Sequence, residues 1–144
     1  MKTQTYSNHR RIVPGFHIIL SSLLLLGTLI AAINAFRHMP NHGGFMSAVL
    51  IENMFACGLL LFWYSRQFPM KVQDRAIRAE ENLRHFALTG KLLDSRLSMS
   101  QIVALRFAAD TEFLLLAEKA ANENMKANAI KMAIVNWRPD NHRA

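Results

Sequence analysis

The sequence predicts an all-α membrane protein, with a transmembrane hairpin of two helices followed by a small cytoplasmic domain of about four helices. Three observations predict this fold. Two apolar stretches, residues 16–36 and 45–64, are each long enough to cross a bilayer and are separated by eight residues. Basic residues gather outside these stretches. No segment of the 144 residues shows the alternating pattern of a β-strand.

The two arms have the length and composition of membrane spans. Residues 16–36 include no formal charge over 21 positions, and residues 45–64 include one, Glu52. At 1.5 Å per helical residue each arm is about 30 Å long, which matches the hydrocarbon core. The outer loop 37–44 holds Pro40, Gly43 and Gly44, which suit a reversal of the chain. Backbone groups in lipid must bond within their own segment, so two antiparallel helices are expected.

The basic residues flank the hairpin unevenly, which predicts its orientation. Only Arg37 lies between the arms, whereas the flanks hold Lys2, Arg10, Arg11, Arg66, Lys71, Arg75 and Arg78. By the positive-inside rule, the anchor segment 1–15 and the domain 65–144 are both expected in the cytoplasm. These cations suit the anionic inner leaflet of a membrane. The net charge of +7 therefore does not require nucleic acid as a partner.

Small residues mark one face of the first arm. Gly27, Ala31 and Ala35 recur every four positions, a spacing that allows a second helix to approach closely. Ordinary small residues of a membrane span would give the same pattern. Asn34 lies near the outer end of this arm, where water can satisfy its side chain.

The pair Glu52-Asn53 is the most unusual feature of the second arm. Glu52 lies seven residues from its outer end, about 10 Å along the helix. A charged side chain at that depth is costly, by about 2.5–3.5 kcal/mol at the centre of a span, so we expect the neutral form to be favoured. One interpretation is a proton or cation path, or a contact with another subunit. The alternative is a neutral Glu52 bonded to Asn53 or to a hydroxyl of the first arm.

Metal, cofactor and catalytic motifs are weak or absent in the sequence. His38 and His42 lie four apart in the outer loop, but Pro40 between them argues against a common helical face, so no metal site is expected. The single Cys57 excludes an intramolecular disulfide. The sequence has no glycine-rich phosphate loop, nucleophile elbow or His-Glu-x-x-His motif. We therefore expect no enzyme, no cofactor and no small-molecule substrate.

The cytoplasmic part is predicted to begin with a helix that restarts at Pro69 and ends before Gly90. Residues before a proline avoid helical geometry, so the second span should kink or stop near Phe68. Along the restarted helix the apolar positions are spaced four, three, four, three, a heptad-like seam formed by Val72, Ala76, Ala79, Leu83 and Phe86. We expect Leu83 and Phe86 to be its buried anchors and the small Ala76 and Ala79 to admit a partner helix. The charged positions on the opposite faces are interpreted as solvated pairs.

Three further helices are expected after the connector 91–97. Ser98 and Gln101 match a capping box that opens a helix to about Ala108. Asp110 should cap the next helix, which runs to Asn124. The last should begin near Lys126, stop before Pro139 and bury the apolar residues Ile130, Ala133, Ile134 and Trp137.

The segment Ala76-Ile-Arg-Ala-Glu-Glu-Asn-Leu-Arg-His-Phe-Ala-Leu-Thr-Gly-Lys-Leu-Leu-Asp94 resembles an uncharacterised family of small, two-span bacterial membrane proteins, a domain-of-unknown-function family. The resemblance extends over nearly the whole chain and includes the entry Pro14-Gly-Phe-His17 to the first arm. It implies a bacterial inner membrane. It implies no activity and gives no role to Glu52.

The sequence favours a non-enzymatic interaction or scaffold protein, an accessory subunit of a membrane complex or a homo-oligomer. The small-residue face, the heptad seam and Glu52 all suit helical partners. The alternative function is a small oligomer that conducts protons or cations along Glu52.

Overall fold

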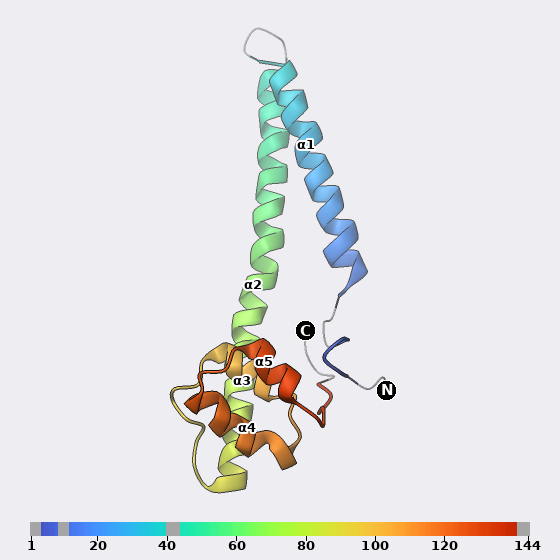
Figure 1. Ribbon diagram of the computed structural model, residues 1–144. Coiled ribbons are helices and arrows are strands. Elements are labelled where there is room, and N and C mark those ends of the chain that lie inside the picture. The colour runs from blue at the N-terminus through green and yellow to red at the C-terminus, as the bar shows by residue number, and fades with distance from the viewer. Residues whose placement is uncertain (1–3, 9–11, 40–43, 141–144) are drawn as a thin grey trace. The chain divides into compact units, whose positions relative to one another are not determined.

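The computed structural model describes residues 4–8, 12–39 and 44–140 (Figure 1). The chain forms two compact units, each with its own contacts. The hairpin unit is Arg11–Phe68, and the helical unit combines Met1–Arg10 with Pro69–Ala144. The described residues contain helices and no strand beyond one isolated bridge, which confirms the all-α prediction.

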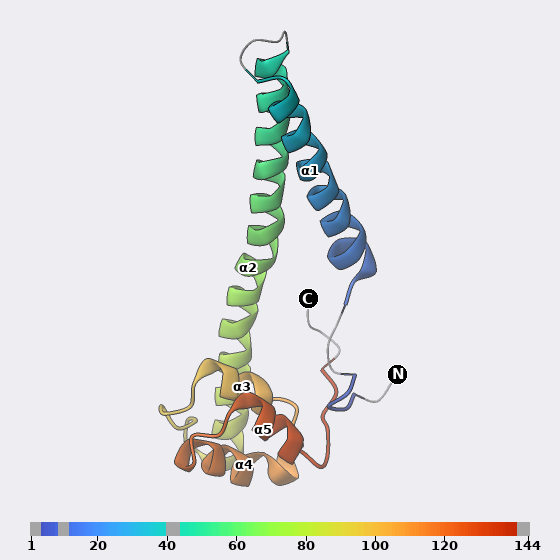
Figure 2. The same ribbon diagram turned by 45° about the horizontal axis from the view of Figure 1, so that its top comes forward.

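Two apolar arms make up the hairpin unit. The first is a π-helical segment, η1 (Gly15–Leu20), followed directly by α1 (Ser21–Arg37). The second is the N-terminal part of α2 (Phe45–Thr89). Both views show the arms antiparallel and closest where α1 ends and α2 begins (Figures 1 and 2). Each arm is long and apolar enough to cross a membrane, and only 6% of its most apolar stretch is buried within the chain.

The helix α2 does not restart at Pro69, so that part of the sequence prediction is wrong. It runs without interruption from Phe45 to Thr89 with Pro69 inside it. Proline has no N–H to donate to the carbonyl of Ser65 one turn earlier. The Ser65 hydroxyl donates to a different acceptor, the carbonyl of Phe62, at 2.8 Å. The loss of a single backbone bond does not end a helix whose flanking turns are intact.

The helical unit combines the C-terminal part of α2 with three short helices that pack on one another. These are α3 (Met99–Leu105), α4 (Asp110–Asn122) and α5 (Ala127–Ala133). Its largest fully buried side chains are Phe107, Phe113, Leu105 and Ile130. The α2 helix contributes Ile77 to this core. The predicted count of about four helical segments is therefore confirmed, with the first continuous with the second apolar arm.

Local signals explain the end of α2 and the start of α3. Gly90 has a φ of +73° and donates to the carbonyl of Phe86, which confirms the left-handed end of α2. The Ser98–Gln101 capping box is present, with the Ser98 N–H donating to Gln101 Oε1 at 2.7 Å. Asp110 is not a cap, because Ala109 holds that position and Asp110 begins the helix. Its carboxylate bonds to Arg84 of α2 instead.

The last predicted helix is shorter than expected. It ends at Ala133, which is exposed, whereas Ile130 and Ile134 are buried as predicted. Trp137 lies beyond the helix in an isolated antiparallel bridge with Ala108. Its ring packs 5.1 Å from the ring of Phe107, centroid to centroid. A tertiary backbone pairing, invisible to helical periodicity, therefore sets the conformation of this segment.

The two ends of the described chain meet within the helical unit. The Gln4 side-chain amide donates to the Asp140 carbonyl at 3.1 Å, and the Asp140 N–H donates to Gln4 Oε1 at 2.8 Å. This pair of bonds occupies both hydrogen-bonding groups of one side chain with one residue's backbone. The segment predicted as a membrane-surface anchor thus contacts the C-terminal segment through Gln4.

Candidate functional site

The small-residue face of the first arm lies against the second arm. A Cβ added to Gly27 would collide with the ring of Phe55. Ala31 is buried, Ala35 is partly buried, and Ala48 on α2 is buried. Near the start of the first arm, the rings of Phe16 and Phe62 stack with their centroids 4.6 Å apart. The Gly27 position therefore allows a large aromatic side chain to pack directly on the α1 backbone.

Glu52 is partly buried, and its Oε2 atom is fully buried without a hydrogen-bond partner among the described residues. Asn53 is exposed, and Asn34 is partly buried. The expected bond from a first-arm hydroxyl does not reach this oxygen, because Thr28 donates to the carbonyl of Leu24 at 2.8 Å. Ser21 likewise donates to the carbonyl of His17. Hydroxyls inside apolar helices commonly bond one turn back in this way, which leaves them no donor for a neighbour.

His38 is the outer-loop histidine that the described residues include. His38 Nδ1 lies 2.9 Å from the carbonyl of Asn34, and His42 lies outside the described residues. The described part of the chain contains no cluster of three or more His, Cys, Asp or Glu side chains that could hold a metal ion.

The face of α2 that docks on the helical unit is charged rather than apolar. Glu81 is 4% exposed, and Arg84 donates to Glu81 Oε2 at 3.0 Å. Arg84 also donates to Asp110 at 2.7 Å and to the carbonyl of Ala108 at 2.7 Å. Its guanidinium lies 4.1 Å from the centroid of the Phe113 ring. We call this group the Arg84 junction.

The Arg84 junction corrects the prediction of a solvated charged face. A carboxylate removed from water is stable only when it is paired and hydrogen-bonded, and Arg84 supplies that pairing to Glu81. Arg138 adds a second, longer contact at 3.9 Å from Glu81 Oε1. The signal present in the sequence is the position of Glu81 and Arg84 on the same helical face as Ile77. The partners Asp110 and Ala108 come from far along the chain and carry no local signal.

The predicted heptad seam is exposed, so Leu83 and Phe86 are not buried anchors of this chain. Leu83 is 68% exposed, Phe86 is 51% exposed and Val72 is 68% exposed. Ala76 and Ala79 are exposed as well. The Arg84 junction and Ile77 occupy the other faces of α2, which turns the seam outward. We call these five residues the apolar stripe.

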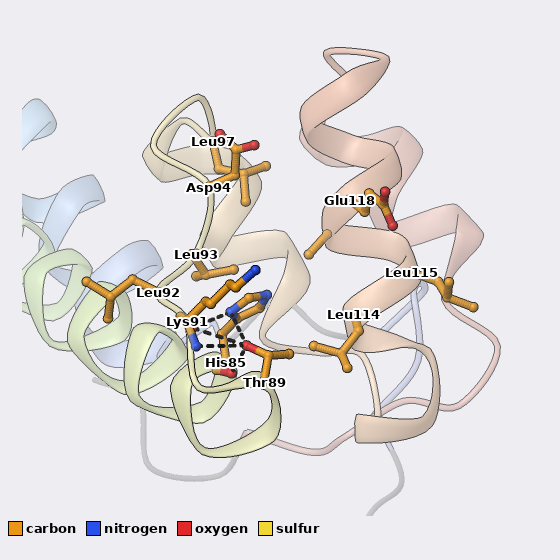
Figure 3. A pocket seen from close by; sticks show the side chains of 11 residues that line it. His85, Thr89, Lys91, Leu92, Leu93, Asp94, Leu97, Leu114, Leu115 and Glu118 are labelled. Carbon is orange, nitrogen blue, oxygen red and sulfur yellow. Dashed lines mark hydrogen bonds between the residues drawn. The ribbon is translucent and has the colours of Figure 1, made fainter.

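A hollow of about 570 Å³ lies between the end of α2, the loop after it and α4 (Figure 3). Its apolar lining includes Leu93, Leu97 and Leu114, and Lys91, Asp94 and Glu118 supply charged side chains. His85 Nδ1 lies 2.7 Å from the carbonyl of Lys91, so this nitrogen carries the proton. The bond holds the His85 ring to the start of the loop and so helps to shape one side of the hollow.

At the rim of this hollow, Asp94 forms an ion pair with Arg96 across 2.6 Å. The side-chain and backbone hydrogen bonds from Arg96 lower the pKa of Asp94 to about 2. The same carboxylate raises the pKa of Arg96 above its usual value. Both groups are exposed to solvent, so this pair fixes the loop locally and does not resemble the buried Arg84 junction.

The hollow and the Arg84 junction hold charged and imidazole groups, and several of these groups bond to other parts of the fold. His85 holds the loop, Glu81 and Arg84 join α2 to α4, and Glu112 accepts the backbone N–H groups of Val135 and Asn136. The sequence does not signal this last contact, since an acidic residue in the first turn of a helix is ordinarily explained by the helix dipole. The arrangement favours a structural role for these groups.

Comparison with known proteins identifies the chain by family alone. No curated protein and no solved structure matches it. One family matches along the full chain, residues 1–144, in agreement with the resemblance of the Ala76–Asp94 segment. The chain belongs to this family, which is described as "Family of unknown function (DUF6526)".

Proposed function

We propose that the protein is a two-span integral membrane protein that acts by binding other membrane-protein subunits, rather than as an enzyme. The observation that carries the proposal is the exposure of the two apolar arms, of which only 6% is buried within the chain. Apolar helices of this length that do not bury each other require lipid or protein around them. A soluble core helix of the same composition would be mostly buried.

The orientation follows from the flanking charges. Seven basic residues flank the hairpin, against Arg37 between the arms, which favours both termini in the cytoplasm. The family resemblance supports the bacterial inner membrane as the location. Anionic lipids of the inner leaflet would then contact Arg66, Lys71 and Arg75 next to the second arm. The helical unit would lie in the cytoplasm and present its surface to partners.

A reporter fused after Ala144 tests this topology. Green fluorescent protein should fluoresce there, and alkaline phosphatase should be inactive, because the first folds in the cytoplasm and the second outside it. A variant without residues 45–64 is the matched control, since one remaining span should carry the C-terminus across the membrane and reverse both signals. Active phosphatase on the intact chain, or release of the protein from membranes by alkaline carbonate, would overturn the proposal.

The second candidate function is proton or cation conduction by an oligomer that uses Glu52. It is favoured by one observation, the buried Oε2 atom of Glu52 without a hydrogen-bond partner in the described residues. An ionisable group in a span ordinarily faces a polar path or a partner. Dye-reported proton flux into liposomes should then fall to background with Glu52→Gln and persist with the neighbouring control Asn53→Ala. Equal, negligible flux in all three proteins would remove this candidate.

A further inference from the structure

The apolar stripe of α2 points away from the core of the unit that contains it. Ile77, Glu81 and Arg84 hold the opposite side of α2 against the helical unit. Val72, Leu83 and Phe86 are each more than half exposed. The two faces share a helix but no residue, so the stripe can be covered without disturbing the core.

The stripe has the spacing of a coiled-coil seam. Its residues follow the order 72, 76, 79, 83 and 86, so Ala76 and Leu83 take the a positions, and Val72, Ala79 and Phe86 take the d positions. Helical periods place the docked residues Ile77, Glu81 and Arg84 at b and f positions, on the far side of such a seam. All a and d positions of the seam therefore lie on the face of α2 that is not docked.

The charges beside the seam indicate which helix covers it. Arg75 takes a g position and Glu80 takes the following e position, and both side chains are exposed. In a parallel, in-register pair of helices, g of one helix lies opposite the next e of the other. Arg75 of each copy would therefore meet Glu80 of the other, twice in a symmetric pair. An antiparallel pair would set Arg75 near Asn82 and Glu80 near Gln73, with no opposite charges.

We infer that the apolar stripe binds a second copy of this chain, with the two α2 segments parallel and in register. The inference rests on the proposed function in one respect, because copies with the same membrane topology leave the bilayer in the same direction and can pair in parallel. The small residues Ala76 and Ala79 bring the helices close at the middle of the seam, and Val72, Leu83 and Phe86 pack on either side. A two-fold pair is also the commonest symmetry of homo-oligomers.

Cysteine crosslinking of the full-length protein in liposomes tests the pairing. On a Cys57→Ser background, Ala76→Cys, Ala79→Cys and Leu83→Cys should each form a disulfide-linked dimer under mild oxidation. Arg78→Cys is the matched control, since it is exposed on the same turns but lies off the seam. Dimers at all three seam positions and none at residue 78 support the parallel pair. Equal crosslinking at all four positions, or none, would overturn it.

Mixed variants separate the two orientations. Val72→Cys mixed with Leu83→Cys should form no heterodimer in a parallel pair, because the two positions lie about 16 Å apart along the helix axis. An efficient Val72–Leu83 crosslink would show an antiparallel pair and overturn the inference. Protection of Leu83→Cys from a water-soluble maleimide without any crosslink would identify a lipid surface as the occupant, and would overturn it as well.

Charge exchange tests the register. Arg75→Glu and Glu80→Arg should each weaken dimerisation roughly tenfold, because two attractive pairs become two repulsive ones. The double variant that exchanges both charges should restore it. The reporter fusions remain the separate test of topology, so a chain that spans the membrane correctly but fails to crosslink would refute the pairing alone.

Discussion

The C-terminal part of α2 buries its charged face and exposes its apolar face, the reverse of what their hydrophobicity predicts. One face carries Ile77, Glu81 and Arg84 and is docked on the helical unit. The other carries Val72, Leu83 and Phe86 and is exposed. An apolar stripe is ordinarily the buried side of a surface helix. Here Ile77 and the charge-assisted bonds of the Arg84 junction fix the helix in place. The buried face of α2 is therefore the one that finds bonding partners in the helical unit, and it is not the more hydrophobic face.

The largest effect should come from breaking the Arg84 junction. Arg84→Ala would leave the Glu81 carboxylate, whose side chain is 5% exposed, with the 3.9 Å contact to Arg138 in place of its 3.0 Å ion pair. Removing one member of a buried ion pair typically costs about 3–5 kcal/mol. Urea unfolding of the full-length protein in detergent, followed by Trp137 fluorescence in a Trp63→Phe background, should show this loss. A loss as small as that of an exposed pair would mean that water reaches the junction.

Truncation of single apolar residues should separate the two faces directly. Ile77→Ala should lower the free energy of unfolding by about 2–4 kcal/mol, as expected for a large-to-small change in a core. Leu83→Ala, of similar size on the exposed face, should change it by no more than about 0.5 kcal/mol in dilute detergent. The same unfolding assay measures both. If Leu83→Ala were the more damaging change, the face assignment would be reversed.

A smaller effect is expected at the start of α3, on neither face of α2. Ser98→Ala removes the acceptor of the Gln101 N–H and one side of the capping box, at a cost of about 0.5–2 kcal/mol. Ser100→Ala is the comparison variant, because the Ser100 hydroxyl lies 3.1 Å from the Ser98 hydroxyl but does not cap the helix. Equal destabilisation by both variants would show that the cap contributes nothing beyond helix propensity.

The smallest effect concerns pH and the exposed Asp94–Arg96 pair, a counterpart to the buried junction. The pKa of Asp94 is lowered in the folded chain to about 2, from an ordinary value of 3.8, so its contribution to stability is present above pH 3.8 and is lost as the pH falls toward 2. Asp94→Asn should therefore differ slightly from the parent at pH 5 and converge with it at pH 2. A constant difference across that range would exclude the ion pair as its cause.

Local chemistry in the sequence predicts much of the fold but not the choice between the faces of α2. The Ser98–Gln101 pair and Gly90 mark the ends of helices correctly because their hydrogen bonds are made within a few residues. The prediction at Pro69 is wrong because the loss of one backbone hydrogen bond costs less than the hydrogen bonds of the intact helical turns on both sides contribute. Trp137 is held by its backbone bridge to Ala108, and Arg84 reaches Asp110 on another helix. Contacts of this kind join distant segments, so they leave no periodic pattern in the sequence.

The candidate sites follow the same division. Gly27 and Phe55 lie together because small and large residues complement each other across two adjacent helices. The spacing of the apolar stripe is readable in the sequence, but heptad spacing describes a surface and does not say whether the same chain covers it. Only the positions of Ile77 and the Arg84 junction show that the stripe faces outward.

The contact between Gln4 and Asp140 restricts how many times the chain can cross a membrane. Two residues joined by hydrogen bonds lie on the same side of any bilayer, whatever lies between them in the sequence. The 135 residues between them can therefore cross a membrane only an even number of times. In the proposed membrane topology, two crossings by the two apolar arms satisfy this rule, whereas a single crossing would separate Gln4 from Asp140. The hydrogen bonds between Gln4 and Asp140 thus require an even number of crossings, a constraint that is independent of hydropathy and charge.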